Sequence, residues 1–471
     1  MLKIAPGPPL VTPAAMRSAE AAAIAAGTPA LVLMERACAA AVAAILRFCP
    51  GQTALVLCGP GNNGGDGYGV ALGLQAAGVA VRVAAAGPAR GEPAATMAAR
   101  WAGPVESLPD AAPAPLIIDA LFGTGLARPL PAEVQAAIDR LRGAAETVVA
   151  IDIASGVDAL TGALLGAPLA ADLTVSFGSM KRGQALGQGR QMSGRVVVAD
   201  IGVAIPAVGA TLIAPPQRSA LAVDTHKYRR GAVLVVEGDA VRGGAARLTA
   251  LAALRSGAGV VTLAGPGPGG PADAIMRRSD AEGAAMLNDP RLGAIAIGPG
   301  LVDGQRGRDW LARVLAGDTP VVADAGAFAV ALGAGVPGAG AFSGARAPLV
   351  VTPHEGEFAR LFGAIGGDRV GAAQAAAVSS GAIVVLKGPE TIVAAPDGRV
   401  AINTHAAAWL ATAGSGDALT GIIAGLLAQG LASFDAACAA VWLHGDAGLC
   451  GGPGMIADEI AALLPQVLAA L

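Results

Sequence analysis

Two glycine-rich stretches hold side chains that could do chemistry, and the first is GPGNNGGDG (59–67). Its glycines satisfy the dinucleotide-binding pattern G-x-G-x-x-G, which binds phosphate at a helix N-terminus. We expect the stretch to form a turn before the helical segment GYGVALGLQAAG (67–78). That pattern also needs an acidic residue about 20 positions on for the ribose, and the next apolar run, VAVRVAAAG (79–87), ends without one. The stretch instead contains Asn62, Asn63 and Asp66. Because amide and carboxylate oxygens orient polar ligands or hard cations, the sequence predicts a polar ligand site here.

The second stretch is ATAGSGDALTGIIAGLLAQG (411–430), in which apolar residues recur at helical spacing from Leu419 to Leu427. The pattern predicts a helix that begins near Asp417, after a turn formed by Gly414, Ser415 and Gly416. Free N–H groups at such a helix start bind anions. A carboxylate beside them could take a proton from a hydroxyl as phosphate arrives, although an Asp here could also simply cap a buried helix.

Two more carboxylates lie inside apolar runs. Asp119 falls in IIDALFGTGLARPL (117–130), before a glycine-containing loop, and Asp152 falls in VVAIDIASGVDALTG (148–162), shortly before Ser155. A buried carboxylate is costly without a partner. We therefore interpret Asp119 and Asp152 as functional, and Asp158 as a turn cap.

Short apolar runs that alternate with alanine-rich helical stretches must position these groups. The runs are 53–58, 79–85, 115–119, 147–153, 173–177 and 195–201 in the first half, and 231–238, 259–264, 293–298, 320–325, 347–352 and 382–387 in the second. Runs that are apolar on both faces predict parallel sheets covered by helices, with ligand sites at the carboxyl ends of the strands. The uncharged, proline-containing stretch 204–217 predicts a boundary near Pro215. We expect two open α/β domains, 1–214 and 215–471, the first of them Rossmann-like.

Composition excludes several classes of function. The 471 residues are 54% hydrophobic and 14% charged, which predicts a folded chain. A net charge of −3 and 3% aromatic residues predict no nucleic-acid partner. Five scattered cysteines predict neither disulfides nor a zinc site. The apolar run 418–434 is shorter than the roughly 20 residues of a membrane span, and prolines interrupt the N-terminus, so we expect a cytoplasmic protein with no membrane partner. The alanine-rich stretch 16–27 suggests a homo-oligomer contact.

The motifs AAMRSAEAAAI (14–24), LVLMERA (31–37), GPGNNGGDG, DALFGTGL (119–126) and IDIASGVDALTG (151–162), in this order, resemble the NAD(P)H-hydrate epimerase domain, the YjeF N-terminal family. The resemblance covers roughly residues 10–205. It implies that the hydrated nicotinamide binds Asn62, Asn63, Gly64, Gly65, Asp66, Gly123, Thr124, Gly125, Leu126, Ala127, Arg128, Pro129 and Asp152. It implies a potassium site at Asn63, Asp119 and Ser155. Ala154 stands where the family usually has proline, a position that shapes the turn and ligates nothing.

The segments 226–264, IGPGL (297–301), TPHEGE (352–357) and LKGPETIV (386–393), followed by the GSGD turn, resemble the ADP- or ATP-dependent NAD(P)H-hydrate dehydratase of the ribokinase-like superfamily. The resemblance covers about 220–471. It implies a nucleotide site at Lys387, Gly388, Pro389, Glu390, Thr391, Gly414, Ser415 and Gly416. It implies a hydrate site at Ala245, Gly300, His354 and Asp417. A lone histidine is more often structural, but within TPHEGE at a strand end we interpret His354 as a site residue.

Two departures from the second family are visible. VVADAGAF (321–328) replaces the usual DADALN and keeps Asp324 as a candidate. Val241 and Arg242 stand where a tyrosine is typical.

Together the two resemblances imply a bifunctional enzyme that repairs hydrated nicotinamide cofactors, NADHX and NADPHX. The first domain would interconvert the R and S epimers, with Asp152 stabilising a planar iminium. The second would phosphorylate the C6 hydroxyl of the S epimer, with Asp417 as the base, and then eliminate phosphate. Potassium, magnesium and ADP or ATP are the implied cofactors. The sequence leaves open whether ADP or ATP is the phosphoryl donor, and whether NADHX or NADPHX is the preferred substrate.

The alternative is a vitamin or sugar kinase fused to a non-catalytic binding or dimerisation domain. The GSGD turn alone does not exclude it; the TPHEGE and KGPET motifs, joined to a complete epimerase pattern, argue against it.

Overall fold

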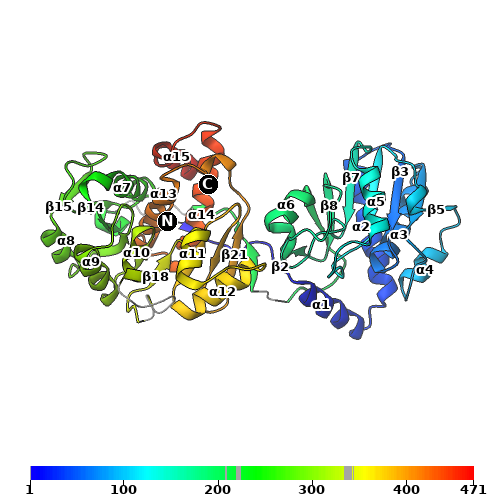
Figure 1. The fold of residues 1–471 in the computed structure, drawn as a ribbon, viewed down its shortest axis with the longest axis horizontal. Coiled ribbons are helices and arrows are strands. Elements are labelled where there is room, and N and C mark those ends of the chain that lie inside the picture. Colours follow the sequence, from blue (N-terminus) through cyan, green and yellow to red (C-terminus); the bar gives the residue numbers. More distant parts are fainter. Residues whose placement is uncertain (1, 207–208, 219–223, 334–341, 343) are drawn as a thin grey trace. The chain divides into compact units, whose positions relative to one another are not determined.

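The computed structural model describes residues 2–206, 209–218, 224–333, 342 and 344–471, and these form two compact units (Figure 1). The N-terminal unit is Pro9–Ala210, and the C-terminal unit is Thr211–Leu471 together with the described part of Met1–Pro8. The short strand β1 (Leu2–Lys3) pairs antiparallel with β12 (Gln217–Arg218), and Leu2 is buried in the C-terminal core. The boundary predicted near Pro215 did not anticipate this N-terminal strand. Residues 207 and 208 of the predicted boundary stretch lie outside the described residues.

The N-terminal unit is built on a parallel sheet of seven strands in the order β10-β8-β7-β6-β3-β4-β5. Its strands are β3 (Ala54–Cys58), β4 (Val81–Ala85), β5 (Val105–Ser107), β6 (Leu116–Ala120), β7 (Thr147–Ile151), β8 (Leu173–Phe177) and β10 (Arg195–Ala199). Six of them confirm the apolar runs predicted in the first half. β5 was missed because its three residues are largely exposed and include a glutamate. A small parallel pair, β2 (Leu10–Val11) with β9 (Met180–Lys181), adds to this unit.

Helices cover both faces of this sheet, as predicted. They are α1 (Pro13–Ala25), α2 (Ala30–Phe48), α3 (Asn62–Ala76), α4 (Ala94–Ala99), α5 (Ala132–Leu141) and α6 (Gly187–Ser193). Alternate residues of β3 point to opposite faces: Leu55 and Leu57 pack with α5, whereas Val56 and Cys58 pack with α2 and α3. A side chain at Gly69 of α3 would place its Cβ 2.2 Å from the Sγ atom of Cys38 on α2. The glycines of α3 therefore allow α2 to pack closely against it.

The C-terminal unit is built on a sheet of ten strands in the order β11-β21-β20-β19-β18-β17-β16-β13-β14-β15. Its strands are β11 (Ala210–Leu212), β13 (Ala232–Val236), β14 (Val260–Ala264), β15 (Ile275–Arg278), β16 (Leu292–Ile297), β17 (Val321–Ala323), β18 (Leu349–Val351), β19 (Ile383–Leu386), β20 (Thr391–Ala394) and β21 (Val400–Asn403). The six runs predicted in the second half are confirmed as parallel strands. Beyond these six runs, the sheet continues with β20 and β21, which pair antiparallel and were not among the predicted runs. The link from β19 to β20, residues 387–390, is too short for a crossover helix.

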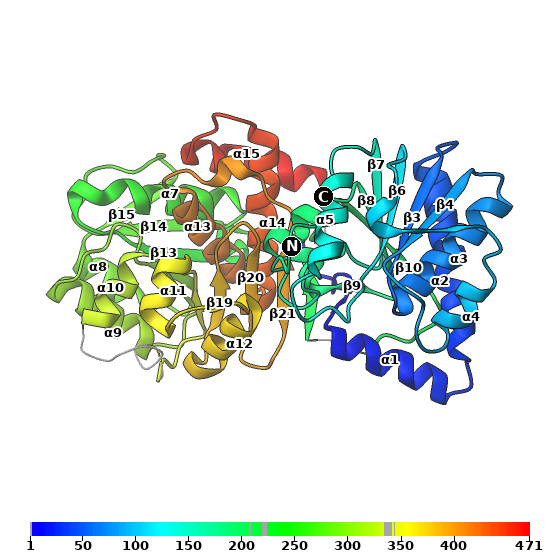
Figure 2. The ribbon, with the colours of Figure 1, turned by 45° about the vertical axis from the view of Figure 1, so that its right-hand side comes forward.

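The helices of this unit are α7 (Gly243–Arg255), α8 (Asp280–Met286), α9 (Gln305–Ala316), α10 (Gly326–Gly333), α11 (Glu355–Phe362), α12 (Arg369–Ser380), α13 (Ser415–Ala428), α14 (Ser433–Gly451) and α15 (Ala457–Ala470). Figure 2 shows α7 and α13 side by side over the sheet, and their side chains share one core with α14 and α15. α13 is buried along almost its whole length, which confirms the predicted buried helix. In the described part of the chain no single helix meets the length and hydropathy of a membrane span; α1 and α2 do so only as a pair bent by 120°.

Candidate active sites

The first candidate site lies where β3, β6 and β7 end, at the start of α3. We predicted that residues 59–67 form a turn, but α3 already begins at Asn62. A Cβ at Gly64 would lie only 1.8 Å from the carbonyl oxygen of Gly59, so the glycines let the helix start fold back against the strand end. Asn62, Asn63 and Asp66 therefore project from the first turns of a helix, whose free N–H groups face the same region.

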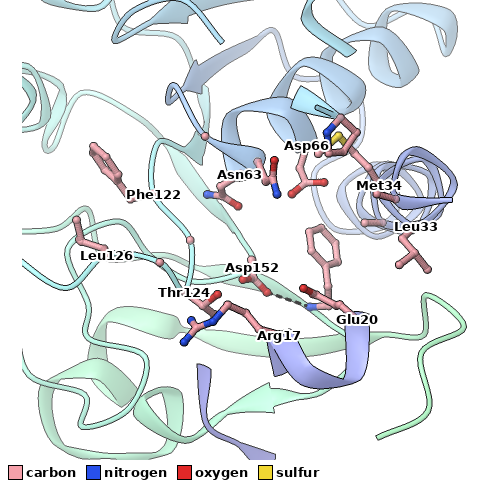
Figure 3. Close-up of a pocket in the computed structure, with 18 of the residues that line it drawn as sticks. Arg17, Glu20, Leu33, Met34, Asn63, Asp66, Phe122, Thr124, Leu126 and Asp152 are labelled. Atoms are coloured by element: carbon pink, nitrogen blue, oxygen red, sulfur yellow. Dashed lines mark hydrogen bonds between the residues drawn. The ribbon is translucent and has the colours of Figure 1, made fainter. Parts of the chain in front are cut away.

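A cavity of about 550 Å³ opens in front of these side chains (Figure 3). The predicted residues that line it are Asn62, Asn63, Asp66, Gly123, Thr124, Gly125, Leu126, Ala127, Arg128 and Asp152. Gly64, Gly65 and Pro129 were also predicted but are not among its lining residues. Gly65 instead packs on Ala94, whose Cα would lie 2.7 Å from an added Cβ.

Asp152 follows β7 with a positive φ of 67°, a conformation that non-glycine residues seldom adopt. Its carboxylate is ion-paired with Lys181 on β9, whose side chain is almost completely buried. The Nζ atom of Lys181 also donates to the carbonyl oxygens of Phe177 at 2.8 Å and Ser179 at 3.1 Å. It donates to Ser176 Oγ at 3.1 Å as well. Because these groups all accept hydrogen bonds, they fix the side chain of Lys181, and its ion pair in turn fixes Asp152.

Two further carboxyl groups, Glu20 of α1 and Asp66, share the cavity with Asp152 (Figure 3). Burial raises the pKa of Asp66 well above its ordinary value, and the nearby charges of Asp152 and Glu20 raise it further. Burial also raises the pKa of Glu20, followed by the charge of Asp152. The cavity thus brings three carboxyl groups close to one buried cation.

Asp119 and Ser155 meet behind this cavity. Asp119 is 1% exposed, and its Oδ2 atom accepts from the Ser155 backbone N–H at 2.8 Å. Its Oδ1 atom lies 2.5 Å from Ser155 Oγ, which in turn accepts from the backbone N–H of Phe122 at 2.8 Å. Burial raises the pKa of Asp119, against the lowering effect of these hydrogen bonds. The pair fixes the start of the loop that lines the cavity.

Asn63 borders the same loop: a Cβ at Gly123 would lie 3.3 Å from its Cγ atom. Both polar atoms of its buried amide lack a hydrogen-bond partner among the described residues. A buried, unsatisfied amide is costly, so this group is suited to a ligand. Within the described ranges, no three His, Cys, Asp or Glu side chains gather to hold a metal ion.

The second candidate site lies at the start of α13. Gly414 is the N-cap residue, with φ of 90°, and the helix begins at Ser415. Gly416 and Asp417, which we predicted at the edge of the helix, therefore lie within its first turn. A Cβ at Gly416 would be 3.1 Å from Lys387 Nζ, so the absence of a side chain lets the lysine approach the helix start.

Lys387 is paired with Asp324, the candidate residue in VVADAGAF (321–328), the segment that differs from the usual family motif. Its Nζ atom donates to Asp324 Oδ1 at 2.9 Å. Thr420 of α13 donates to Asp324 Oδ2, also at 2.9 Å, and Asp324 is 1% exposed. Asp324 thus links the ends of β17 and β19 to α13.

Among the described residues, no cation forms an ion pair with Asp417. Burial and the charge of Asp324 raise its pKa to about 6, against the lowering effect of Lys387. Its backbone carbonyl accepts from Thr249 Oγ1 at 3.0 Å, and the same hydroxyl donates to the carbonyl of Ala245 at 3.1 Å. This contact ties the predicted hydrate residue Ala245 to the first turn of α13.

The other predicted residues of this unit have visible structural roles. His354 is the N-cap of α11, where Nδ1 accepts from the N–H groups of Gly356 at 3.0 Å and Glu357 at 3.3 Å. Its backbone forms a bridge with Lys387, which places it at the same sheet edge. Gly300 has φ of 74° and approaches the carbonyl of Arg242. The predicted nucleotide residues Lys387, Gly388, Pro389, Glu390 and Thr391 span the turn from β19 into β20, in which Glu390 is paired with Arg369 at 3.0 Å.

Comparisons with known proteins agree with both halves. A family model described as YjeF-related protein N-terminus matches residues 30–183, and one described as NAD(P)H-hydrate dehydratase matches residues 233–457. The bifunctional NAD(P)H-hydrate repair enzyme of Moorella thermoacetica is 37% identical, over 93% of this chain and 92% of its own. The enzyme of the same name from Salinibacter ruber is 34% identical, over 98% of this chain and 96% of its own. The chain belongs to the bifunctional NAD(P)H-hydrate repair enzyme family.

One solved structure is similar to about half of this chain. It is an ADP/ATP-dependent NAD(P)H-hydrate dehydratase from Bacillus subtilis, co-crystallised with ATP and Mg²⁺. It is 30% identical, covers 53% of this chain and 93% of its own, and has a TM-score of 0.46.

Sequence reasoning missed several residues that this member of the repair enzyme family places in its sites. Arg17 and Glu20 of α1, Leu33 and Met34 of α2, and Phe122 line the first cavity. Lys181 lies beneath it. The motif LVLMERA was noted for its resemblance, but nothing in its spacing shows that α2 faces the cavity. A single lysine in a mixed segment such as MKRG carries no signal of burial.

Proposed function

We propose that this chain repairs hydrated nicotinamide cofactors. Its N-terminal unit interconverts the R and S epimers of NADHX and NADPHX, and its C-terminal unit dehydrates the S epimer at the expense of a nucleotide. The observation that carries the proposal is the similarity over nearly the whole chain to enzymes named for this repair. The two carboxylate sites at the strand ends support it.

The dehydration needs a better leaving group than hydroxide. Water added to the nicotinamide ring leaves a hydroxyl at C6, beside the ring nitrogen. Transfer of a phosphoryl group to this hydroxyl displaces its proton and creates a phosphate ester. The nitrogen lone pair then expels phosphate, and loss of a proton from C5 restores the ring double bond. The net products are the reduced cofactor, phosphate and the spent nucleotide.

Asp417 is the proposed base of this step. With a pKa of about 6 it is mostly ionised at neutral pH, yet more basic than an ordinary carboxylate, which suits proton removal from a hydroxyl. The N–H groups that open α13 face the incoming phosphates, and Lys387 adds positive charge beside Gly416. Magnesium would be held largely by the nucleotide phosphates, because no cluster of three acidic or histidine side chains occurs in the described residues. Bound there, it would neutralise phosphate charge.

Asp152 is the proposed catalytic group of the epimerase. Protonation and departure of the C6 hydroxyl as water would leave a planar iminium, and the Asp152 carboxylate would stabilise that cation until water adds again to either face and releases a proton. The ion pair with Lys181 fixes Asp152 in its strained conformation. Asp66, whose pKa is raised by burial, lies across the cavity as a group able to retain a proton.

The potassium site implied for this family fits the residues present. The unsatisfied amide of Asn63 is the observation that supports it. Asn63, Asp119 and Ser155 would supply amide, carboxylate and hydroxyl oxygens, the ligands that hard cations prefer. A bound potassium ion would fix the loop beside Gly123 and offset the charge of Asp119.

One experiment tests both activities. A mixture of both hydrate epimers is incubated with the full chain, potassium and magnesium, and recovery of the reduced-nicotinamide absorbance is followed with ADP, with ATP and with neither. Complete, nucleotide-dependent recovery is expected, and it identifies the phosphoryl donor. Recovery that stops with one epimer left would make the first unit a non-catalytic module, and no recovery would favour the kinase alternative. Assembly into a homo-oligomer and a cytoplasmic location stay predictions, which gel filtration and cell fractionation would test.

A further inference from the structure

Ser415, the first residue of α13, is in contact with a histidine that no motif singled out. Its Oγ atom lies 2.9 Å from Nε2 of His444, on α14. The same Nε2 atom lies 3.0 Å from the backbone carbonyl oxygen of Ser415. One ring nitrogen therefore faces two oxygens of a single residue in the GSGD turn.

Proton accounting decides the direction of these two hydrogen bonds. A carbonyl oxygen only accepts, so Nε2 must carry the hydrogen that it donates to Ser415 O. This N–H is then shared between the carbonyl and the hydroxyl, and Oγ accepts from it. The proton of the serine hydroxyl is left over, and no other acceptor contacts Oγ in the part of the chain that the structure describes. Ser415 is only 6% exposed, so this donor needs a partner that the described residues do not supply.

The histidine stays neutral while it does this. Burial lowers the pKa of His444 to about 4, and the nearby charge of Lys387 lowers it further, against the raising effect of the Ser415 carbonyl. A neutral ring with hydrogen on Nε2 satisfies both serine oxygens without adding charge beside Lys387.

We propose that His444 orients Ser415 so that the serine hydroxyl donates a hydrogen bond to the phosphoryl group transferred at the start of α13. Ser415 is then a catalytic residue that supplements the backbone N–H groups, and His444 is a positioning residue that acts through it. This inference rests on the proposed dehydratase activity of the C-terminal unit.

The test uses the full chain and four variants, Ser415→Ala, His444→Gln, His444→Leu and the double variant Ser415→Ala/His444→Leu. The assay contains the purified S epimer of hydrated NADH, the nucleotide that supports the wild type, and magnesium. Removal of one donor to a developing charge costs about 10²-fold or more in kcat. We expect Ser415→Ala to lower kcat by about that factor, with little change in the KM for nucleotide, because the hydrogen bond acts in the transition state.

The histidine variants separate orientation from packing. Glutamine places an amide N–H near the position of Nε2, so His444→Gln should keep kcat near that of the wild type. His444→Leu should resemble Ser415→Ala, and the double variant should be no slower than either single one. Epimer exchange by the N-terminal unit serves as the control for an intact chain.

Three results would overturn the inference: kcat of Ser415→Ala within twofold of the wild type, equal losses in His444→Gln and His444→Leu, or losses that multiply in the double variant. Should His444→Leu fail to fold, Ser415→Ala and His444→Gln still decide. A wild-type chain that does not dehydrate the S epimer would instead contradict the proposed function itself, so the two failures are distinguishable.

Discussion

The two candidate sites use the same parts in different ways. Each has a lysine paired with an aspartate at the carboxyl ends of parallel strands, and the lysine is buried in the first site and half-buried in the second. In the N-terminal unit Lys181 pairs directly with Asp152, the proposed catalytic carboxylate. In the C-terminal unit Lys387 pairs with Asp324, and Asp417 stands one residue beyond Gly416 with a raised pKa. A carboxylate paired with a cation is suited to stabilise positive charge, and one without its own cation is suited to accept a proton.

The strongest test of this difference between the sites is to neutralise Asp417, the carboxylate that is not paired with a lysine. We expect Asp417→Asn to lower kcat for dehydration by about 10³-fold or more, since a positioned base contributes up to about 10⁴-fold. The measurement is turnover of the S epimer with saturating nucleotide. Epimer exchange should be unchanged, and near-normal dehydration would show that another group is the base.

Neutralising the paired carboxylate should have the complementary effect. We expect Asp152→Asn to slow epimer exchange by about 10²-fold, because the amide no longer stabilises a cation and leaves Lys181 buried without its counter-charge. Exchange is followed by separating the R and S forms, with dehydration of the S form as the internal control. Asp158→Asn is the matched variant, because Asp158 only accepts hydrogen bonds within its own turn, from the N–H groups of Leu160 at 2.9 Å and Thr161 at 2.8 Å. Equal losses in both variants would contradict the role of Asp152.

The pH dependence of dehydration tests whether Asp417 is the group that titrates. With a pKa of about 6, Asp417 should give a rate that is flat near pH 8 and falls about tenfold by pH 5. Asp324→Asn removes a negative charge that raises this pKa, so the acid limb of the profile should move to lower pH. A limb that stays in place in Asp324→Asn would show that a different group titrates.

The same raised pKa has a consequence for stability. The folded state binds a proton at Asp417 more tightly than the unfolded chain does, so an ionised Asp417 destabilises the fold above about pH 6. The rise of this pKa from its ordinary value of 3.8 to about 6 corresponds to at most about 3 kcal/mol. Asp417→Asn should therefore raise the Tm of the C-terminal unit at pH 8, and this gain should shrink on acidification toward pH 4. An equal gain at both pH values would contradict the linkage.

The smallest expected effect concerns His354. Loss of an N-cap costs about 1 kcal/mol, which lowers Tm by roughly 2–4 °C in a domain of this size. We expect this decrease in His354→Ala, and its recovery in His354→Asn, because asparagine also caps helices. Differential scanning calorimetry of the full chain measures both. If His354→Asn does not recover the Tm of the wild type, the imidazole ring stabilises the fold through contacts other than its N-cap hydrogen bonds.

Much of the fold could be predicted from the sequence because parallel strands buried on both faces are continuous apolar runs. β3 and β13 are examples in which every residue is buried. β15 was missed because its residues Met276 and Arg278 are exposed, and the antiparallel pairing of β20 was missed because periodicity does not encode strand direction. Helix starts were placed late for α3 and α13, since glycines in the first turn look like loop residues.

The residues of the candidate sites that could be predicted are those that lie within the sequence motifs. Asp119 and Ser155 meet, as do Lys387 and Asp324, because their strands end at one sheet edge. Lys181 and His444 could not be found, because their importance comes from residues distant in sequence or from a neighbouring helix. The orientation of the Lys181 and His444 side chains depends on these contacts and not on the residues next to them in the sequence.

The pairing of β1 with β12 makes the N-terminal unit an insertion rather than an appendage. The chain crosses between the units twice, after Pro8 and after Ala210, and the C-terminal unit contains residues from both sides of the N-terminal unit. During synthesis, the residues of β1 are made before the intervening unit, and their partner β12 is made only after it. A fragment that begins at Thr211 would lack Leu2, whose burial in the core is worth about 1.5–3 kcal/mol, and would leave β12 without its strand. Separating the two activities by simple truncation therefore removes part of the C-terminal fold along with the epimerase.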